Sequence, residues 1–185
     1  MKRVLFKRSI SPFSRWHQFR RMLWDIVWMV FFRPSPRPFH GWRRWLLRLF
    51  GARIDSTAYI YPGARIWAPW MVEIGAQTGI ADGAVLYSQG LIRIGDRCVI
   101  SQGAYICTGT HDYVQEDFPL VVRPVVIGDD VWIAARAFIH PGVELGHGVV
   151  VAACAVVIKS IPSYTVVAGN PAYVIKNYEK RKNID

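Results

Sequence analysis

Aliphatic side chains recur every six positions along the chain from residue 54 onward. Fifteen positions carry Ile, Leu or Val with this spacing, in five groups of three: Ile54, Ile60 and Ile66; Ile74, Ile80 and Leu86; Ile94, Ile100 and Ile106; Ile127, Ile133 and Ile139; Leu145, Val151 and Val157. Such a run is very improbable by chance, so the chain contains an internal repeat. Units of this kind bury a continuous core only when they stack on one another.

The longer steps between the groups predict the shape of the stack. The step from Ile66 to Ile74 and its counterpart in the next group span eight residues, and the step from Ile106 to Ile127 spans twenty-one. Each longer step follows a third repeat, so three hexads form one coil of eighteen residues and the extra residues leave from one corner of a triangular prism. We therefore predict an all-β fold, a parallel β-helix whose strands pair with those of the coils above and below.

Two further patterns accompany the repeat. The fourth residue after each aliphatic one is mostly small, which predicts a second and tighter inward position at Ala58, Ala64, Thr78, Ala84, Gly90, Cys98, Ala104, Thr110, Ala137 and Ala155. Glycine directly follows the aliphatic residue at positions 75, 95, 128 and 146. We expect a sharp turn there that requires a backbone without Cβ.

Charge divides the chain into unequal parts. Residues 1–53 hold 13 of the 23 basic side chains and a single acid, Asp25, whereas the remaining residues carry a net charge of −2. The three cysteines, Cys98, Cys107 and Cys154, are odd in number and lack metal-binding spacing. They therefore argue against a disulfide framework or a zinc site and favour a reducing compartment.

The basic segment 1–53 is also rich in tryptophan, and five of the eight tryptophans precede residue 54. Its apolar run, residues 22–32, contains Asp25 and is about half the length that spans a bilayer. It also lacks the small-residue cleavage site of a signal peptide. Two interpretations stay open: a mostly helical segment that lies on an anionic membrane surface, or a helical cap over the first coil. Nucleic-acid binding would not need so many apolar residues.

The longest insertion, loop 107–126, carries the best candidate for chemistry. Its sequence THDYVQEDFP is too polar for a core, so packing does not account for it. His111 lies in this loop, and an imidazole titrates close to neutral pH, as a general base requires. Of the other histidines, His140 and His147 occupy turn positions and two lie in the basic segment, so we expect structural or solvated roles for them.

The stretches IGDRCVISQGAYI and IGDDVWIAARAFIHPGVELG resemble the left-handed parallel β-helix of the hexapeptide-repeat acyltransferases. The resemblance covers residues 54–176, leaves 177–185 as a polar tail, and implies a left-handed coil and a homotrimer. In the sugar O-acetyltransferases of this family a histidine in the same context is the catalytic base, and His111 in CTGTHDY matches it. The residues that orient this base are not matched cleanly, and Asp112 or Asp82 could substitute for them.

The related γ-type carbonic anhydrases share the coil but bind zinc through three histidines, two of them five residues apart. No histidine pair in this chain has that spacing, so we expect no metal.

The segment after the loop resembles the acetyl-CoA segment of the family. By this resemblance Trp132 walls the pantetheine groove between subunits, the amides of Ala135 and Ala153 donate to the thioester carbonyl and the pantetheine arm, Lys159 and Lys176 lie near the phosphates, and Asn170 in AGNPA lies in the loop that lines the adenine end. An exposed aromatic and two solvated lysines remain the alternative for the tryptophan and the lysines.

The stretches FRPSPRP, WRRWLLRLFGARI and YPGARIWAPW, together with the loop, resemble the colanic-acid type acetyltransferases of bacterial exopolysaccharide synthesis. We expect a cytoplasmic enzyme, either free in the cytoplasm or at the inner face of the membrane. It would transfer an acetyl group directly from acetyl-CoA to a sugar hydroxyl of a nucleotide-linked or lipid-linked intermediate. Acetylation of a small free acceptor and a trimeric scaffold without catalysis are the alternatives.

Overall fold

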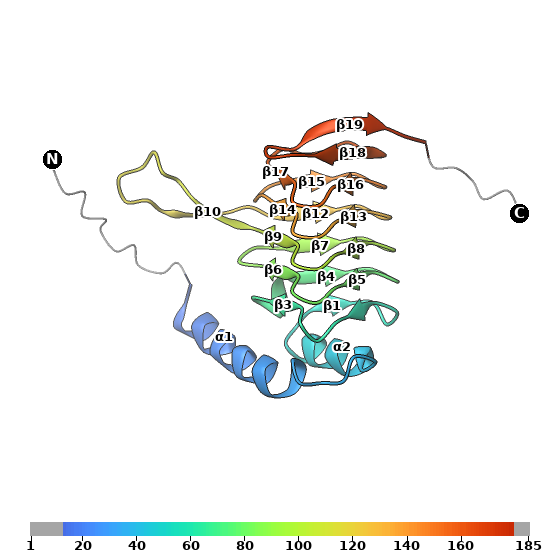
Figure 1. Ribbon diagram of the computed structural model, residues 1–185. Helices are drawn as coiled ribbons and strands as arrows, with labels where there is room; N and C mark the ends of the chain where they lie inside the picture. Colours follow the sequence, from blue (N-terminus) through green and yellow to red (C-terminus); the bar gives the residue numbers. More distant parts are fainter. Residues whose placement is uncertain (1–12, 180–185) are drawn as a thin grey trace, which may run out of the picture.

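The protein is a parallel β-helix of triangular section that stands on two helices (Figure 1). The computed structural model describes residues 13–179, so most of the tail 177–185 lies outside the described residues. The first sheet contains β1 (Arg53–Ile54), β4 (Val72–Ile74), β7 (Ile92–Ile94), β12 (Val125–Ile127) and β15 (Glu144–Leu145). The second contains β2 (Tyr59–Ile60), β5 (Gly79–Ile80), β8 (Val99–Ile100), β13 (Trp132–Ile133), β16 (Val150–Val151), β18 (Thr165–Ala168) and β19 (Tyr173–Asn177). The third contains β3 (Arg65–Ile66), β6 (Val85–Tyr87), β9 (Tyr105–Cys107), β14 (Phe138–Ile139) and β17 (Val156–Val157).

The aliphatic positions of the repeat stack directly on one another. In the first sheet Ile54 pairs with Ile74, Ile74 with Ile94, and Ile94 with Ile127, all in parallel strands. These side chains are nearly inaccessible to solvent and form one continuous core. The predicted β-helix is therefore confirmed.

Every insertion leaves the coil between a strand of the third sheet and the next strand of the first sheet, as the spacing predicted. We call this edge, with residues 67–71, 88–91 and 108–124, the hairpin corner. The first of these insertions contains a short 3-10 helix, η2 (Pro69–Met71), and the longest contains the strands β10 (Gly109–His111) and β11 (Leu120–Val122).

Most of the predicted tight inward positions are buried, but Gly90 and Thr110 are not. At both positions the chain has already left the coil at the hairpin corner. The inward position is filled instead by Ile92 and Val125, at the start of the next strand, and both are fully buried.

The glycines that follow the repeat are required for a different reason from the one predicted. Positive φ angles occur two residues later in the turn, at Gln77 and Arg97 for example, whereas Gly75 and Gly95 do not have them. A Cβ on Gly75 would lie 2.2 Å from the Oδ1 atom of Asp96 in the next coil. At Gly75 and Gly95 glycine is needed because a carboxylate of the neighbouring coil approaches the backbone too closely for a side chain, and at Gly128 and Gly146 because the backbone of the neighbouring coil does.

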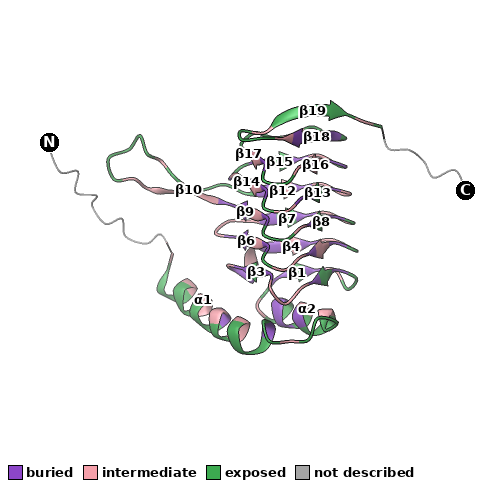
Figure 2. Ribbon diagram, in the orientation of Figure 1, coloured by how far each residue is buried: buried purple, intermediate pink, exposed green. Residues whose placement is uncertain are grey.

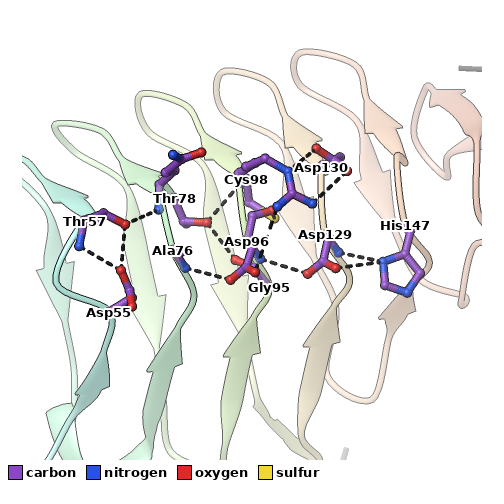
Figure 3. Close-up of polar contacts among 12 residues, drawn as sticks. Asp55, Thr57, Ala76, Thr78, Gly95, Asp96, Cys98, Asp129, Asp130 and His147 are labelled. Atoms are coloured by element: carbon purple, nitrogen blue, oxygen red, sulfur yellow. Dashed lines mark hydrogen bonds and ion pairs between the residues drawn. The ribbon is translucent and has the colours of Figure 1, made fainter. Parts of the chain in front are cut away.

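These carboxylates form a ladder along the corner between the first and second sheets (Figure 3). Asp96 accepts a hydrogen bond from the Ala76 amide (2.7 Å), Asp129 accepts one from the Asp96 amide (2.9 Å), and His147 Nδ1 accepts one from the Asp129 amide (3.0 Å). His147 therefore has a structural role in the ladder, which ties each coil to the next.

The N-terminal helices α1 (Arg15–Val27) and α2 (His40–Leu49) lie under the first coil (Figure 1), joined through a π-helical turn, η1 (Trp28–Phe32). Ser14 starts α1 because its hydroxyl accepts a hydrogen bond from the His17 amide. No helix among the described residues is long and apolar enough to cross a membrane.

Side chains of these helices satisfy the carbonyl groups at the open edge of the first coil. The donors are Trp24 to Ile66 O, Trp28 to Ala64 O, Arg43 to Ile60 O, Arg44 to Ala58 O and Arg48 to Ile54 O, at 2.6–2.9 Å. An open sheet edge would otherwise leave these groups unpaired. The inner face of the segment thus caps the β-helix.

Arg43 is the centre of this cap. Its guanidinium group is fully buried and donates to the carbonyls of Ile60, Pro36 and Arg37. We expect Arg43→Met to lower the free energy of unfolding by about 2–4 kcal/mol, because the buried carbonyls lose charged donors. Thermal or denaturant unfolding measures this change. Arg53→Met is the matched control, because Arg53 is exposed and its pair with Glu73 contributes little. Equal stability of the two variants would show that solvent satisfies these carbonyls.

Candidate active site

The hairpin formed by β10 and β11 projects from the hairpin corner and carries His111 at the end of β10 (Figure 1). The strands are antiparallel, and His111 pairs with Leu120. Asp112 shapes the hairpin loop, because its carboxylate accepts hydrogen bonds from the Val114 amide (3.0 Å) and from the Gln115 side chain (2.9 Å). The imidazole therefore stands on a short, locally braced ribbon.

A backbone carbonyl fixes the ring of His111. Its Nδ1 atom lies 2.9 Å from the Phe118 carbonyl oxygen, and its ring stacks on the Phe118 ring with centroids 4.5 Å apart. Because a carbonyl oxygen can only accept, this hydrogen bond assigns the proton to Nδ1. The Nε2 atom of the neutral ring is then free to accept a proton.

The two carboxylates that the sequence suggested for orienting His111 make other contacts. Asp82 lies at the corner between the second and third sheets, where it pairs with Arg37 (3.3 Å) and accepts a hydrogen bond from the Gly63 amide (2.7 Å). Asp112 serves its own loop, as described above. Within the described chain, the contact that orients the ring comes from Phe118 instead.

A cavity of about 910 Å³ opens between the hairpin, the hairpin corner and α1. His111 and Leu120 line it from the hairpin, Trp67 lines it from the corner, and Tyr87 lines it from the end of β6. The third wall is a polar stripe of α1, His17, Arg21 and Asp25, in which Arg21 pairs with Asp25 (2.8 Å) and lies over the ring of Trp67.

This third wall was missed from the sequence, where the segment was considered only as a membrane-binding or capping element. The spacing of its three polar residues was the signal in the sequence that could have revealed this wall. Residues 17, 21 and 25 are four apart and therefore share one face of a helix.

Polar atoms without a partner gather around this cavity. Three buried side-chain atoms have no hydrogen-bond partner among the described residues, His17 Nε2, Arg21 Nε and Gln89 Oε1, and all three residues line the cavity. Buried polar atoms are usually satisfied, so unpaired ones at a cavity indicate a place for water or a polar ligand. Burial lowers the pKa of His17, and the nearby Arg21 and Arg20 lower it further, which favours the neutral imidazole.

The alanines predicted to supply backbone donors lie at the corner between the second and third sheets. Ala135 and Ala153 each occupy the second position of a tight turn, and the two turns are joined by the hydrogen bond from the Cys154 amide to the Ala135 carbonyl (2.9 Å). Neither the Ala135 nor the Ala153 amide donates to another residue of the described chain. Both N–H groups are therefore available to a ligand.

The other residues of the predicted acetyl-CoA segment lie on the upper coils. Trp132 is half exposed in β13 and donates to the Ser101 hydroxyl (3.0 Å). Lys159, Asn170 and Lys176 are exposed in or beside the last strands. In the part of the chain that the structure describes, none of these four contacts His111, which stands at a different corner of the same prism.

The buried cysteines are poor nucleophiles. Burial raises the pKa of Cys98 to about 11 and also raises that of Cys107, whose thiol donates to the Gly109 carbonyl (3.1 Å). Since the thiolate is the reactive form, Cys107 is inert although it lies close to His111 in sequence. No group of three metal-ligating side chains occurs in residues 13–179.

Comparison with known proteins defines the class. A family model described as "Bacterial transferase hexapeptide (six repeats)" matches residues 124–159. The chain is also 43% identical over 154 residues to the protein of Escherichia coli (strain K12) named "Putative colanic acid biosynthesis acetyltransferase WcaF". The aligned stretch covers 83% of this chain and 85% of that relative. The chain therefore belongs to the hexapeptide-repeat transferases and is an acetyltransferase of that family. The resemblance inferred from the sequence is confirmed.

Two solved structures share the fold over nearly the whole chain. One is the hexapeptide-repeat containing acetyltransferase VCA0836 of Vibrio cholerae O1 biovar eltor, complexed with acetyl coenzyme A. It has a TM-score of 0.81 and 27% sequence identity and covers 93% of this chain and 94% of that one. The other is a maltose O-acetyltransferase from Clostridium difficile 630, with a TM-score of 0.80, 26% identity and 90% coverage of each chain.

Proposed function

We propose that this protein is an acetyl-CoA dependent O-acetyltransferase that acts on a sugar hydroxyl of a nucleotide-linked or lipid-linked exopolysaccharide intermediate. The observation that carries the proposal is His111, with Nδ1 held by the Phe118 carbonyl and its side chain lining a cavity that is large enough for a sugar. The name of the Escherichia coli relative supports a polysaccharide pathway, and the complex of the Vibrio cholerae structure supports the donor.

His111 acts as the general base in this mechanism. Its Nε2 atom removes the hydroxyl proton while the sugar oxygen attacks the thioester carbonyl, because an un-ionised hydroxyl is a weak nucleophile. The Ala135 amide donates to the oxyanion that forms. The carbon–sulfur bond then breaks and the imidazolium returns the proton to the thiolate. No acyl-enzyme is required, in keeping with the buried state of Cys107.

The active site needs more than one copy of the chain. His111 and the Ala135 and Ala153 turns lie at different corners of one prism. In a homotrimer the projecting hairpin of one subunit faces the corner of its neighbour that carries these turns. Trp132, Lys159, Asn170 and Lys176 of that neighbour then flank the acetyl-CoA. Asp112 acts indirectly, through the shape of the loop.

A membrane-facing role remains for the outer side of the N-terminal helices. The exposed residues Trp16, Phe19 and Leu23 follow one face of α1, and Trp42, Trp45 and Leu49 follow one face of α2. Figure 2 shows these outer faces as exposed and the inner side of α2 as buried. Since residues 1–53 carry a net charge of +12, we propose that this face lies on anionic lipid at the cytoplasmic side of the membrane.

We expect His111→Ala to lower turnover on a sugar acceptor roughly 100-fold to 10,000-fold while the variant remains folded, because a general base contributes about that factor. Coupled detection of free coenzyme A measures the rate. His140→Ala is the matched control and should keep its activity. Near wild-type turnover of His111→Ala would exclude this residue as the base.

Coenzyme A should stabilise the protein against thermal unfolding. Ligand at about 100 times its dissociation constant adds roughly 2.7 kcal/mol when it binds only the native state. The shift should shrink in Lys159→Gln and Lys176→Gln, because both lose a charge near the phosphates, and it should persist in Arg53→Gln, on the first coil. An unchanged transition at millimolar coenzyme A would argue against an enzyme that uses any acyl-CoA.

The membrane proposal is tested without disturbing the cap. Trp45→Gln combined with Leu49→Gln removes outward apolar groups while the inward donors remain, so sedimentation with anionic vesicles should fall sharply. Tyr173→Gln combined with Ile175→Gln, at the opposite end of the molecule, is the control. Binding of the wild type should weaken as salt rises, because the attraction is screened. Equal sedimentation of both double variants would mean that lipid does not contact the outer face of α2.

A further inference from the structure

The cavity beside His111 carries an excess of positive charge that its own residues do not neutralise. Its charged lining residues are Arg21, Arg33, Arg65 and Asp25. Asp25 is paired with Arg21 at 2.8 Å. Neither Arg33 nor Arg65 forms an ion pair with any carboxylate in residues 13–179. Two guanidinium groups are therefore left for a ligand.

These two arginines come from different elements but meet at one ring. Arg33 follows η1 and Arg65 begins β3, and their guanidinium carbons lie 5.5 Å and 5.2 Å from the centre of the Trp28 indole. Trp28 is itself held to the first coil, because its indole N–H donates to the Ala64 carbonyl (2.9 Å). The aromatic face attracts both cations and positions them on a rigid part of the fold.

Two cations that share one ring repel each other unless an anion lies between them or beside them. Guanidinium groups match the oxygens of phosphate in pairs, so phosphate is the anion that this arrangement fits well. The cavity has a volume of about 910 Å³, near the upper end of the roughly 300–1,000 Å³ found for small-molecule sites. It is therefore larger than one sugar ring requires.

We propose that Arg33 and Arg65 bind the diphosphate that links the acceptor sugar to its carrier, with Trp28 as their support. This inference rests on the proposed function and specifies its acceptor. The sugar then lies between this anion site and His111, where Gln89 Oε1 and His17 Nε2, both unpaired in the described chain, meet its hydroxyl groups. A nucleotide and a lipid carrier present the same diphosphate chemistry.

Binding of the anion can be measured independently of acetyl transfer. Inorganic pyrophosphate is titrated calorimetrically into the full-length protein saturated with coenzyme A, so that the donor site is occupied. We expect binding by the wild type and by Arg53→Gln combined with Arg93→Gln, a control at exposed arginines outside the cavity. Arg33→Gln combined with Arg65→Gln should weaken binding roughly 10-fold to 100-fold, the usual range for hydrogen bonds to a charged group. No binding by the wild type, or equal binding by the cavity variant, overturns the proposal.

Kinetics then identify what the site recognises. The cavity variant should raise the KM for a nucleoside-diphosphate sugar, a polyprenyl-diphosphate sugar, or both, by roughly the same factor as in the binding experiment. The KM for acetyl-CoA and the rate on the matched phosphate-free sugar should stay within about threefold, a change too small to report a lost charged hydrogen bond. An equal loss on the phosphate-free sugar would mean that the arginines only shape the cavity. If the cavity variant loses activity only on phosphate-free acceptors that are uronic acids, the arginines bind a carboxylate and the diphosphate proposal is wrong.

These experiments distinguish a nucleotide carrier from a lipid carrier, and they test the anion site separately from the proposed acetyl transfer. Whichever diphosphate acceptor the wild type uses identifies the carrier, and either supports the proposal. If the wild type binds pyrophosphate through Arg33 and Arg65 but transfers no acetyl group to any acceptor, the anion site stands and the proposed acetyl transfer fails.

Discussion

Hydrogen bonding between successive coils is the constraint on which the rest of this structure depends. Each strand is only two to five residues long, so no strand is stable alone and every coil relies on the next. The parallel register aligns Ile54, Ile74, Ile94 and Ile127 without offset. An inserted residue inside a strand would break this register for all later coils, so extra residues are tolerated only at a corner. Function is accordingly built at the corners, on a hairpin and on turns.

The same constraint explains why the described chain divides its chemistry between two corners. A hairpin can leave the coil only at a corner, where extra residues do not disturb the strand register. An amide N–H stays unpaired where a turn directs it away from the stacked coils. His111 depends on the first condition, and Ala135 and Ala153 depend on the second. Neither arrangement requires an unusual side chain at the coil itself, which is why the aliphatic core continues unchanged beneath both.

Much of the fold could be predicted from the sequence because the repeat is a one-dimensional signal. The fifteen aliphatic positions and the corner of the insertions followed from counting alone. The predictions for Gly90 and Thr110 were wrong because the same counting was extended past the point where the chain leaves the coil. The role of Gly75 was misjudged because its reason, the carboxylate of Asp96, lies in another coil.

The candidate site was less accessible to sequence reasoning. His111 could be found because its residue type and loop are distinctive. The Phe118 carbonyl that orients it could not, since every residue has a carbonyl and only the folded hairpin selects one. The polar wall of α1 and the pairing of Arg33 and Arg65 over Trp28 depend on contacts between the N-terminal segment and the coils. No local pattern predicts which coil a preceding helix will cover.

The cap formed by Trp24, Arg43 and their neighbours also bears on how large an assembly the chain can form. A β-helix with bare ends could join end to end with another copy, since the edge of one stack would template the next as in a fibre. At one end the carbonyl groups are already engaged by indole and guanidinium donors. At the other end β19 runs antiparallel to β18 and breaks the repeat. The two ends therefore no longer match each other, and growth along the axis is blocked while the three side faces stay open to lateral association.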